Sequence, residues 1–185
     1  MSVHRIASRY AKALLDLSEE EGKLDSILED IQDFYEVTKN RDFYLMVKSP
    51  IINSDKKAKI FDKLFKGKYN KITILFFSII LRKGREMFLP EIAREFILQY
   101  KVLNHISTVK LTTAVEIDNN NLEQIKARLL ESDITDKKIE LITKVDPGII
   151  GGFVMEIGDK LYDASVIHNL NQLKKEFSNN QFVKS

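Results

Sequence analysis

The chain has 185 residues, of which 44% are hydrophobic and 30% charged, a composition typical of a soluble globular protein with one domain or two small ones. It contains no cysteine, which excludes a disulfide framework, a thiolate metal site and a cysteine nucleophile. The net charge of +2 is too small to indicate nucleic-acid binding by itself.

The N-terminal segment MSVHRIASRYAKALLDLSEEE predicts an amphipathic helix with two adjacent stripes, one apolar and one of small residues. The apolar stripe consists of Ile6, Tyr10, Leu14 and Leu17, and the small-residue stripe of Ala7, Ala11 and Ser18. Because small side chains let a second helix approach closely, two buried faces are expected. Acidic residues follow soon after, and no basic end precedes an apolar core, so the pattern is not that of a secretory signal.

Five further helices are predicted in the first part of the chain. Their boundaries are indicated by asparagine, glycine and proline: Gly22, Pro50, Asn53, Gly67, Asn70 and Gly84. The segment ITILFFSIIL, from Ile72 to Leu81, is apolar almost all round, which predicts a central helix wrapped by the others. It is too short to cross a bilayer, since a spanning helix needs about 20 residues.

Near residue 106 the apolar pattern changes from helical spacing to alternation. Strands are predicted in STVKLTTAVEI, KKIELITKV and GFVMEI, with a capped helix after the first. A final helix from about Ser165 is expected to bury an apolar stripe: Val166, Leu170, Leu173 and Phe177. The sequence therefore predicts an α+β protein with two domains. These are an all-α bundle of about six helices at 1–105 and a small α/β domain, ordered strand–helix–strand–strand–helix, at 106–185.

Four of the seven glycines gather in VDPGIIGGFVMEIGDKLYDASV, where a phosphate-binding loop must be weighed against tight turns. A phosphate loop needs a Lys-Ser or Lys-Thr pair and a following helix, whereas strand periodicity follows these glycines. Turn chemistry explains the stretch better. The sequences DPG and GD are typical of turns, and Gly151 and Gly152 suit a bulge or a close approach of two backbones.

The sequence shows no set of residues with catalytic or metal-binding spacing. His4, His105 and His168 lie in separate segments without ligands nearby in sequence, so they are interpreted as isolated histidines. The run Glu19–Glu21 is interpreted as a solvated helix end, because successive helical residues point in different directions. A binding or structural protein is therefore predicted, without an active site, metal or cofactor of its own.

A basic cluster runs from Lys48 to Lys71, with eight lysines and only two acidic residues, Asp55 and Asp62. It allows two interpretations, a solvated helix face or an electrostatic footprint for RNA or an acidic partner, of which the solvated face is favoured. The stripes of the first helix and of the segment 72–81 likewise leave two possibilities open. They form the core, or they form a groove for the amphipathic helix of a partner.

Four stretches, spread along the whole chain, resemble one known family when they are taken in order. They are ASRYAKALLDLSEEEGKLD, FYLMVKSPIINSDKKAKIFDKLF, LRKGREMFLPEIAREFILQY and VDPGIIGGFVMEIGDKLYDASVIHNLNQLKKEF. In this order they resemble the δ subunit of bacterial F-type ATP synthase, a family that includes the mitochondrial oligomycin-sensitivity-conferring protein. The stretch LRKGR departs from the family pattern, since its Arg-Lys pair makes the end of the fifth helix more basic.

The resemblance implies a non-catalytic subunit of the peripheral stalk, which holds the catalytic head still during proton-driven ATP synthesis. Its expected partners are the N-terminus of the ATP synthase α subunit, bound by the helical domain, and the b subunits, contacted by the C-terminal domain. No nucleic acid is expected. The chain would be a monomer within the complex, on the cytoplasmic face of the bacterial inner membrane, and would meet the membrane only indirectly.

The resemblance also implies where the α subunit binds, namely on the first and fifth helices. Eight residues are expected to contribute: Tyr10, Ala11, Leu14, Leu15, Ile72, Leu75, Phe76 and Ile79. Those of the first helix match the Tyr-Ala-Lys-Ala-Leu segment of the family. The alternative function is that of an RNA-binding helical protein that uses the Lys48–Lys71 cluster.

Overall fold

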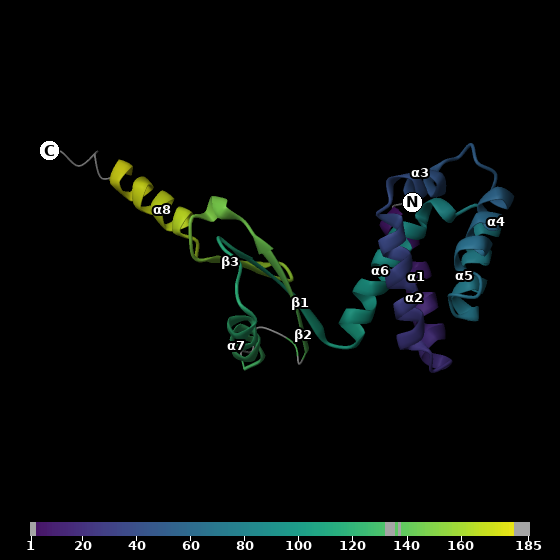
Figure 1. Ribbon diagram of the computed structural model, residues 1–185, viewed down its shortest axis with the longest axis horizontal. Coiled ribbons are helices and arrows are strands. Elements are labelled where there is room, and N and C mark those ends of the chain that lie inside the picture. Colours follow the sequence, from purple (N-terminus) through teal and green to yellow (C-terminus); the bar gives the residue numbers. More distant parts are fainter. Residues whose placement is uncertain (1–2, 132–135, 137, 180–185) are drawn as a thin grey trace. The chain divides into compact units, whose positions relative to one another are not determined.

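The computed structural model describes residues 3–131, 136 and 138–179. The chain divides into two compact units, which we name the helical unit (Met1–Leu103) and the sheet unit (Asn104–Ser185). Figure 1 shows helices in the first unit and a small sheet with helices in the second. The predicted α+β class, with a helical part followed by a small α/β part, is confirmed.

Over the described residues, the helical unit contains six α-helices and a short 3-10 turn, η1, before the last of them. Their bounds are α1 (Val3–Glu20), α2 (Leu24–Thr38), α3 (Arg41–Lys48), α4 (Ser54–Phe65), α5 (Lys71–Arg82), η1 (Glu86–Phe88) and α6 (Leu89–Leu103). The side chains of Asn40, Asn53 and Asn70 accept backbone N–H groups at the starts of α3, α4 and α5. The predicted helix starts at Asn53 and Asn70 are confirmed.

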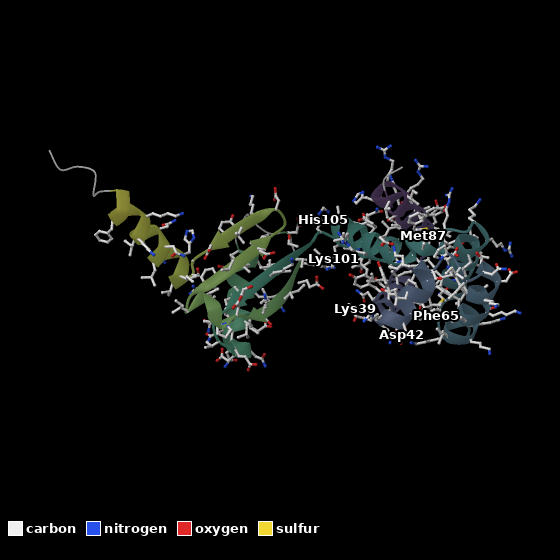
Figure 2. All side chains as sticks on the ribbon, turned by 90° about the horizontal axis from the view of Figure 1, so that it is seen from above. Lys39, Asp42, Phe65, Met87, Lys101 and His105 are labelled. Atoms are coloured by element: carbon white, nitrogen blue, oxygen red, sulfur yellow. The ribbon has the colours of Figure 1, made fainter. Side chains whose placement is uncertain are left out.

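Aromatic rings form the centre of the helical unit. Phe34 on α2 is fully buried, and its ring centroid lies 5.7 Å from that of Phe65 and 4.7 Å from that of Phe77. Figure 2 shows the side chains of this unit, with Phe65 labelled. The first helix, α1, packs mainly against α6, and its buried face contains the small residues Ala7 and Ala11.

Two predictions about buried faces in the helical unit are wrong. On α1, Leu17 is exposed and Tyr10 is only half-buried, because the small-residue stripe takes the face toward the core. The fifth helix, α5, is not a central helix. It packs mainly against α4, α2 and η1, which cover one of its faces, while Leu75 and Ile79 on another face are exposed.

The sheet unit contains a mixed sheet with the strand order β2-β1-β3-β4 over the described residues. Its elements are β1 (Ile106–Thr113), α7 (Asn119–Leu130), β2 (Lys138–Val145), the 3-10 turn η2 (Pro147–Ile149), β3 (Phe153–Ile157), β4 (Lys160–Asp163) and α8 (Val166–Asn179). β1 pairs in parallel with β2 and antiparallel with β3, and β3 forms a hairpin with β4. A small core of Val109, Leu129 and Ile157 joins α7 to the sheet.

The strands differ from the prediction at two places. The first predicted strand, β1, ends at Thr113 and not at Ile117. Thr113 pairs with Val145, the last residue of β2, and with Phe153, the first residue of β3, so neither strand pairs with a later residue of the chain. The short strand β4 was not predicted, since its four residues are all exposed and carry no alternating apolar signal. The turn that joins it to β3 is the predicted hairpin turn at Gly158, which has a φ of +59°.

The prediction that α8 buries its apolar stripe is wrong. All four residues of that stripe are exposed: Val166, Leu170, Leu173 and Phe177. Among the described elements α8 packs mainly against the short turn η2, which is too small to cover a helix face. The sheet unit therefore presents an amphipathic helix whose apolar side is uncovered by the described part of the chain.

Candidate functional site

The eight residues predicted for a partner site fall into two groups in the structure. Ala11, Leu14 and Leu15 are buried in the core of the helical unit. Their side chains therefore support α1 from within and are not available to a partner docked on this surface. Tyr10 and the four residues of α5 remain accessible to different degrees.

The residues predicted on α5 lie along one stripe. The side chain of Leu75 is 59% exposed and that of Ile79 is 40% exposed, while Ile72 and Phe76 are half-buried. Their spacing of three and four residues places them on one face of the helix, away from the face that Phe77 buries in the core. Single exposed apolar residues are ordinary, but a continuous row is typical of a docking surface.

The matching stripe on α1 includes Leu17, which the sequence placed on the apolar stripe but not among the eight predicted site residues, and Ala13, which it did not predict. Ala13 and Leu17 are exposed and share one face of α1 with Tyr10, by their helical spacing. Arg85, just after α5, donates a hydrogen bond to the Tyr10 hydroxyl at 2.5 Å and lies over its ring, so it joins the end of α5 to α1. We name six residues the α1–α5 surface: Tyr10, Leu17, Ile72, Leu75, Phe76 and Ile79.

Two carboxylates of α2 hold the beginning of α5. Asp30 accepts a hydrogen bond from the Thr73 hydroxyl at 2.7 Å. Asp33 accepts hydrogen bonds from the Lys68 ammonium at 2.7 Å and the Tyr69 hydroxyl at 2.6 Å, and these two bonds lower the pKa of Asp33. Burial, and then the bond to Asp33, raise the pKa of Tyr69. The stripe on α5 is thus carried by a helix whose first turn is tied to its neighbour.

The basic cluster is partly neutralised in the structure. The side chain of Lys57 is 2% exposed, and its Nζ lies 2.9 Å from Oε1 of Glu86. Lys48 pairs with Glu91 at 2.6 Å, and Lys68 pairs with the α2 carboxylate described above. The interpretation of the cluster as a solvated helix face is therefore wrong for Lys57. Sequence reasoning missed this pair because its two residues lie in different helices.

The sheet unit has an apolar groove of about 610 Å³ beside the end of β1. It lies between α7 and the loop before β3, and its walls include Leu111, Val115, Ile125, Phe153 and Met155. Val115 and Phe153 are exposed. Like the stripe of α8, the groove offers apolar surface that the described part of the chain leaves accessible to a partner.

The glycine-rich stretch forms turns and a close backbone contact, as predicted. The Asp146 side chain accepts a hydrogen bond from the Gly148 N–H at 2.9 Å, which closes the turn η2. Gly152 has a φ of +73°, and a Cβ atom there would lie 2.2 Å from the carbonyl oxygen of Ala164. The glycines therefore let the start of β3 lie against the segment that leads into α8.

Each of the three histidines lies near a single carboxylate, a contact that their separate positions in the sequence could not show. The pairs are His4–Glu95 at 3.4 Å, His105–Asp136 at 3.9 Å and His168–Asp163 at 3.4 Å. Over the described residues, no group of three or more His, Cys, Asp or Glu side chains could hold a metal ion. None of the described helices is both long enough and apolar enough to span a bilayer.

Comparison with known proteins shows the family. The model described as ATP synthase delta (OSCP) subunit matches residues 6–177. The ATP synthase subunit delta of Cytophaga hutchinsonii is 37% identical over 179 residues, covering 96% of this chain and 97% of that protein. That of Chlorobium phaeobacteroides is 35% identical over 175 residues, covering 94% and 96%.

A solved structure shares the fold. A chain in the mitochondrial ATP synthase hexamer of Toxoplasma gondii matches with a TM-score of 0.72 and 19% identity, covering 92% of this chain and 96% of that one. At this identity the match shows the similarity of fold, and the family model and the bacterial relatives show the membership. The chain belongs to the ATP synthase delta (OSCP) subunit family.

Proposed function

We propose that this chain is a non-catalytic connector in the peripheral stalk of an F-type ATP synthase. It ties the catalytic head to the membrane sector and resists the torque of rotation. The observation that carries the proposal is that each unit has an apolar helix stripe, on α5 and on α8, that the described residues leave exposed. A connector needs two docking surfaces, and such stripes are a common form of docking surface. Its place is the cytoplasmic face of the bacterial inner membrane, where it is held through the complex.

The occupant of the α1–α5 surface is the amphipathic N-terminal helix of the ATP synthase α subunit. Leu75 and Ile79 repeat at the spacing at which one helix meets another, and Tyr10 extends the apolar surface onto α1. Arg82 and Lys83 are exposed at the end of α5, so they favour an acidic residue at the corresponding end of the bound helix.

The occupants of the sheet unit are the C-terminal ends of the b subunits. The exposed stripe of α8 carries Leu170, Leu173 and Phe177 at helical spacing, which suits packing against a second helix. The groove beside β1 adds further apolar surface in the same unit. Both surfaces are apolar and exposed in the same unit, which supports a partner there.

The alternative, RNA binding through the Lys48–Lys71 cluster, is less well supported. Three of its eight lysines face carboxylates, and one of these, Lys57, is buried. Phosphate binding depends on accessible cations that release counterions, and buried or paired lysines contribute little to it.

We expect the double variant Leu75→Asp/Ile79→Asp to bind a synthetic peptide of the α-subunit N-terminus at least ~100-fold more weakly than the parent chain. Burying a Leu or Ile side chain contributes about 1.5–3 kcal/mol, and two charges would have to be desolvated instead. Isothermal titration calorimetry on the whole chain measures the change.

The matched control for this experiment is Leu45→Asp on α3. Leu45 is 54% exposed, similar to Leu75, but it lies outside the α1–α5 surface. Its peptide affinity should stay within about threefold of the parent, as for other surface substitutions. Equal losses for Leu45→Asp and the double variant, or no peptide binding by the parent chain, would refute this docking surface.

A further inference from the structure

Among the strands of the described residues, β2 lies at an edge of the sheet, and β1 is its strand neighbour. The Lys138 N–H donates to the His105 carbonyl at 3.3 Å, and the Asp146 N–H donates to the Thr113 carbonyl at 2.7 Å. Because backbone groups alternate in direction along a strand, the even-numbered residues of β2 turn toward β1 and the odd-numbered residues turn outward. The edge therefore presents the backbone groups of Ile139, Leu141, Thr143 and Val145.

The side chains of β2 also alternate between the two faces of the sheet. Ile139 and Leu141 pack toward α7, on the core side. Glu140 lies on the opposite face, where its Oε2 accepts a hydrogen bond from the Thr108 hydroxyl at 3.0 Å. Ile142 and Lys144 share this face with Glu140 by strand alternation, and both are exposed.

We propose that the free chain pairs with a second copy of itself through β2, in an antiparallel arrangement whose two-fold axis passes at Ile142. Outward backbone groups then face each other, because Leu141 meets Thr143 of the second copy and Ile139 meets Val145. By the antiparallel pattern these pairs exchange about eight backbone hydrogen bonds. The pairing is isologous, so it closes after two copies.

Charge selects this register. With the axis at Ile142, Glu140 lies opposite Lys144 of the second copy, and the same contact occurs twice. An axis at Leu141 would place Lys138 opposite Lys144, and an axis at Thr143 would place Glu140 opposite Asp146. Both alternatives set like charges against each other, which destabilises a strand pair.

The charges on β2 can also be interpreted as ordinary protection of an edge strand against aggregation. They serve that purpose here too, since they oppose the shifted registers and leave one complementary arrangement. The contact is small, so the association is weak, as for interfaces below about 1,200 Å². It concerns the free chain and is compatible with a single copy in the assembled enzyme.

The first test is charge reversal, followed by sedimentation of the whole chain from about 10 μM to about 1 mM, the range in which weak association is resolved. Glu140→Lys and Lys144→Glu should each weaken self-association about tenfold, because each creates two like-charged cross-strand pairs. The double variant Glu140→Lys/Lys144→Glu restores opposite charges and should return to within about threefold of the parent.

The second test is disulfide trapping. The chain has no native cysteine, so any disulfide must form between the introduced cysteines. Ile142→Cys faces its own copy in a non-hydrogen-bonded pair, where Cβ atoms lie about 4.5–5.5 Å apart, so it should oxidise readily to a dimer. A mixture of Glu140→Cys and Lys144→Cys should form the mixed dimer faster than either alone. The control is Leu161→Cys, an exposed position on the other edge strand.

Two results would overturn the proposal. One is a chain that stays monomeric over the whole concentration range while Ile142→Cys oxidises no faster than Leu161→Cys. The other is self-association that the single charge reversals leave unchanged, which would assign it to an apolar surface such as the stripe of α8. Neither result depends on the proposed stalk function, because both tests use the free chain and no ATP synthase partner.

Discussion

Replacing Lys57 with methionine is expected to destabilise the helical unit by about 3–5 kcal/mol, because it leaves the charge of Glu86 buried without its partner. The Lys57 ammonium lies 2.9 Å from Glu86 Oε1 and also donates to the carbonyls of Val47 and Ser49, at 3.0 and 2.7 Å. It thus joins α4 to the end of α3 and to η1. Urea denaturation of the whole chain, followed by helical circular dichroism, measures the loss.

Two controls separate the buried charge from other effects. The double variant Lys57→Met/Glu86→Leu removes both charges and should recover most of the stability, since replacing a whole buried pair is often nearly neutral. Lys59→Met changes an exposed lysine of the same helix and should stay within about 0.5 kcal/mol of the parent. If Lys57→Met and Lys59→Met unfold at the same urea concentration, the pair does not support the unit.

Replacing Gly152 with alanine is expected to destabilise the sheet unit by more than about 3 kcal/mol and to detach the start of α8. The new Cβ would lie 2.2 Å from the Ala164 carbonyl oxygen, a backbone atom that cannot rotate away. The same region carries two hydrogen bonds, from the Ala164 N–H to the Phe153 carbonyl at 2.9 Å and from the Val166 N–H to the Gly151 carbonyl at 3.0 Å. Hydrogen exchange of the peptide covering 153–166 reports their loss.

Gly158→Ala is the matched control for this substitution. Gly158 also has a positive φ, +59°, but a Cβ atom there meets nothing within 4 Å. Only the conformational cost of about 1–2 kcal/mol remains, so exchange should increase much less than in Gly152→Ala. Equal exchange in the two variants would show that the contact between Gly152 and Ala164 does not hold the two segments together.

Features that depend on local chemistry could be predicted from the sequence. Asn53 and Asn70 cap helices because an asparagine side chain reaches the N–H groups of the next turn without help from the rest of the fold. The turn at Asp146 is also local, because the Asp146 side chain accepts a hydrogen bond from the Gly148 N–H two residues later. The hairpin turn at Gly158 is local as well, because it depends on the positive φ of one glycine. Such local signals predict where helices and turns begin without information on how the elements pack.

The exposed faces could not be predicted in this way. An apolar stripe shows that a helix has a partner, but it does not show whether that partner belongs to the same chain. The expectations that α5 is covered all round and that α8 buries its stripe were therefore wrong, although Phe77 and Ile80 of α5 do lie in the core. The burial of Lys57 could not be predicted for a related reason. Its partner Glu86 lies 29 positions away in sequence, and only the fold brings the two residues together. For the α1–α5 surface, the family resemblance indicated the two helices, and the structure showed which of their residues are accessible.

Reconstitution shows whether this chain works as a mechanical link between the catalytic head and the membrane sector. Membranes that carry the ATP synthase base with its b subunits are mixed with purified catalytic heads, both freed of this chain, and membrane-bound ATPase activity is measured after washing. We predict that heads are retained when the parent chain or Leu45→Asp is added, and are lost without the chain or with Leu75→Asp/Ile79→Asp. Heads that stay on the membrane equally well in its absence would show that this chain is not the link.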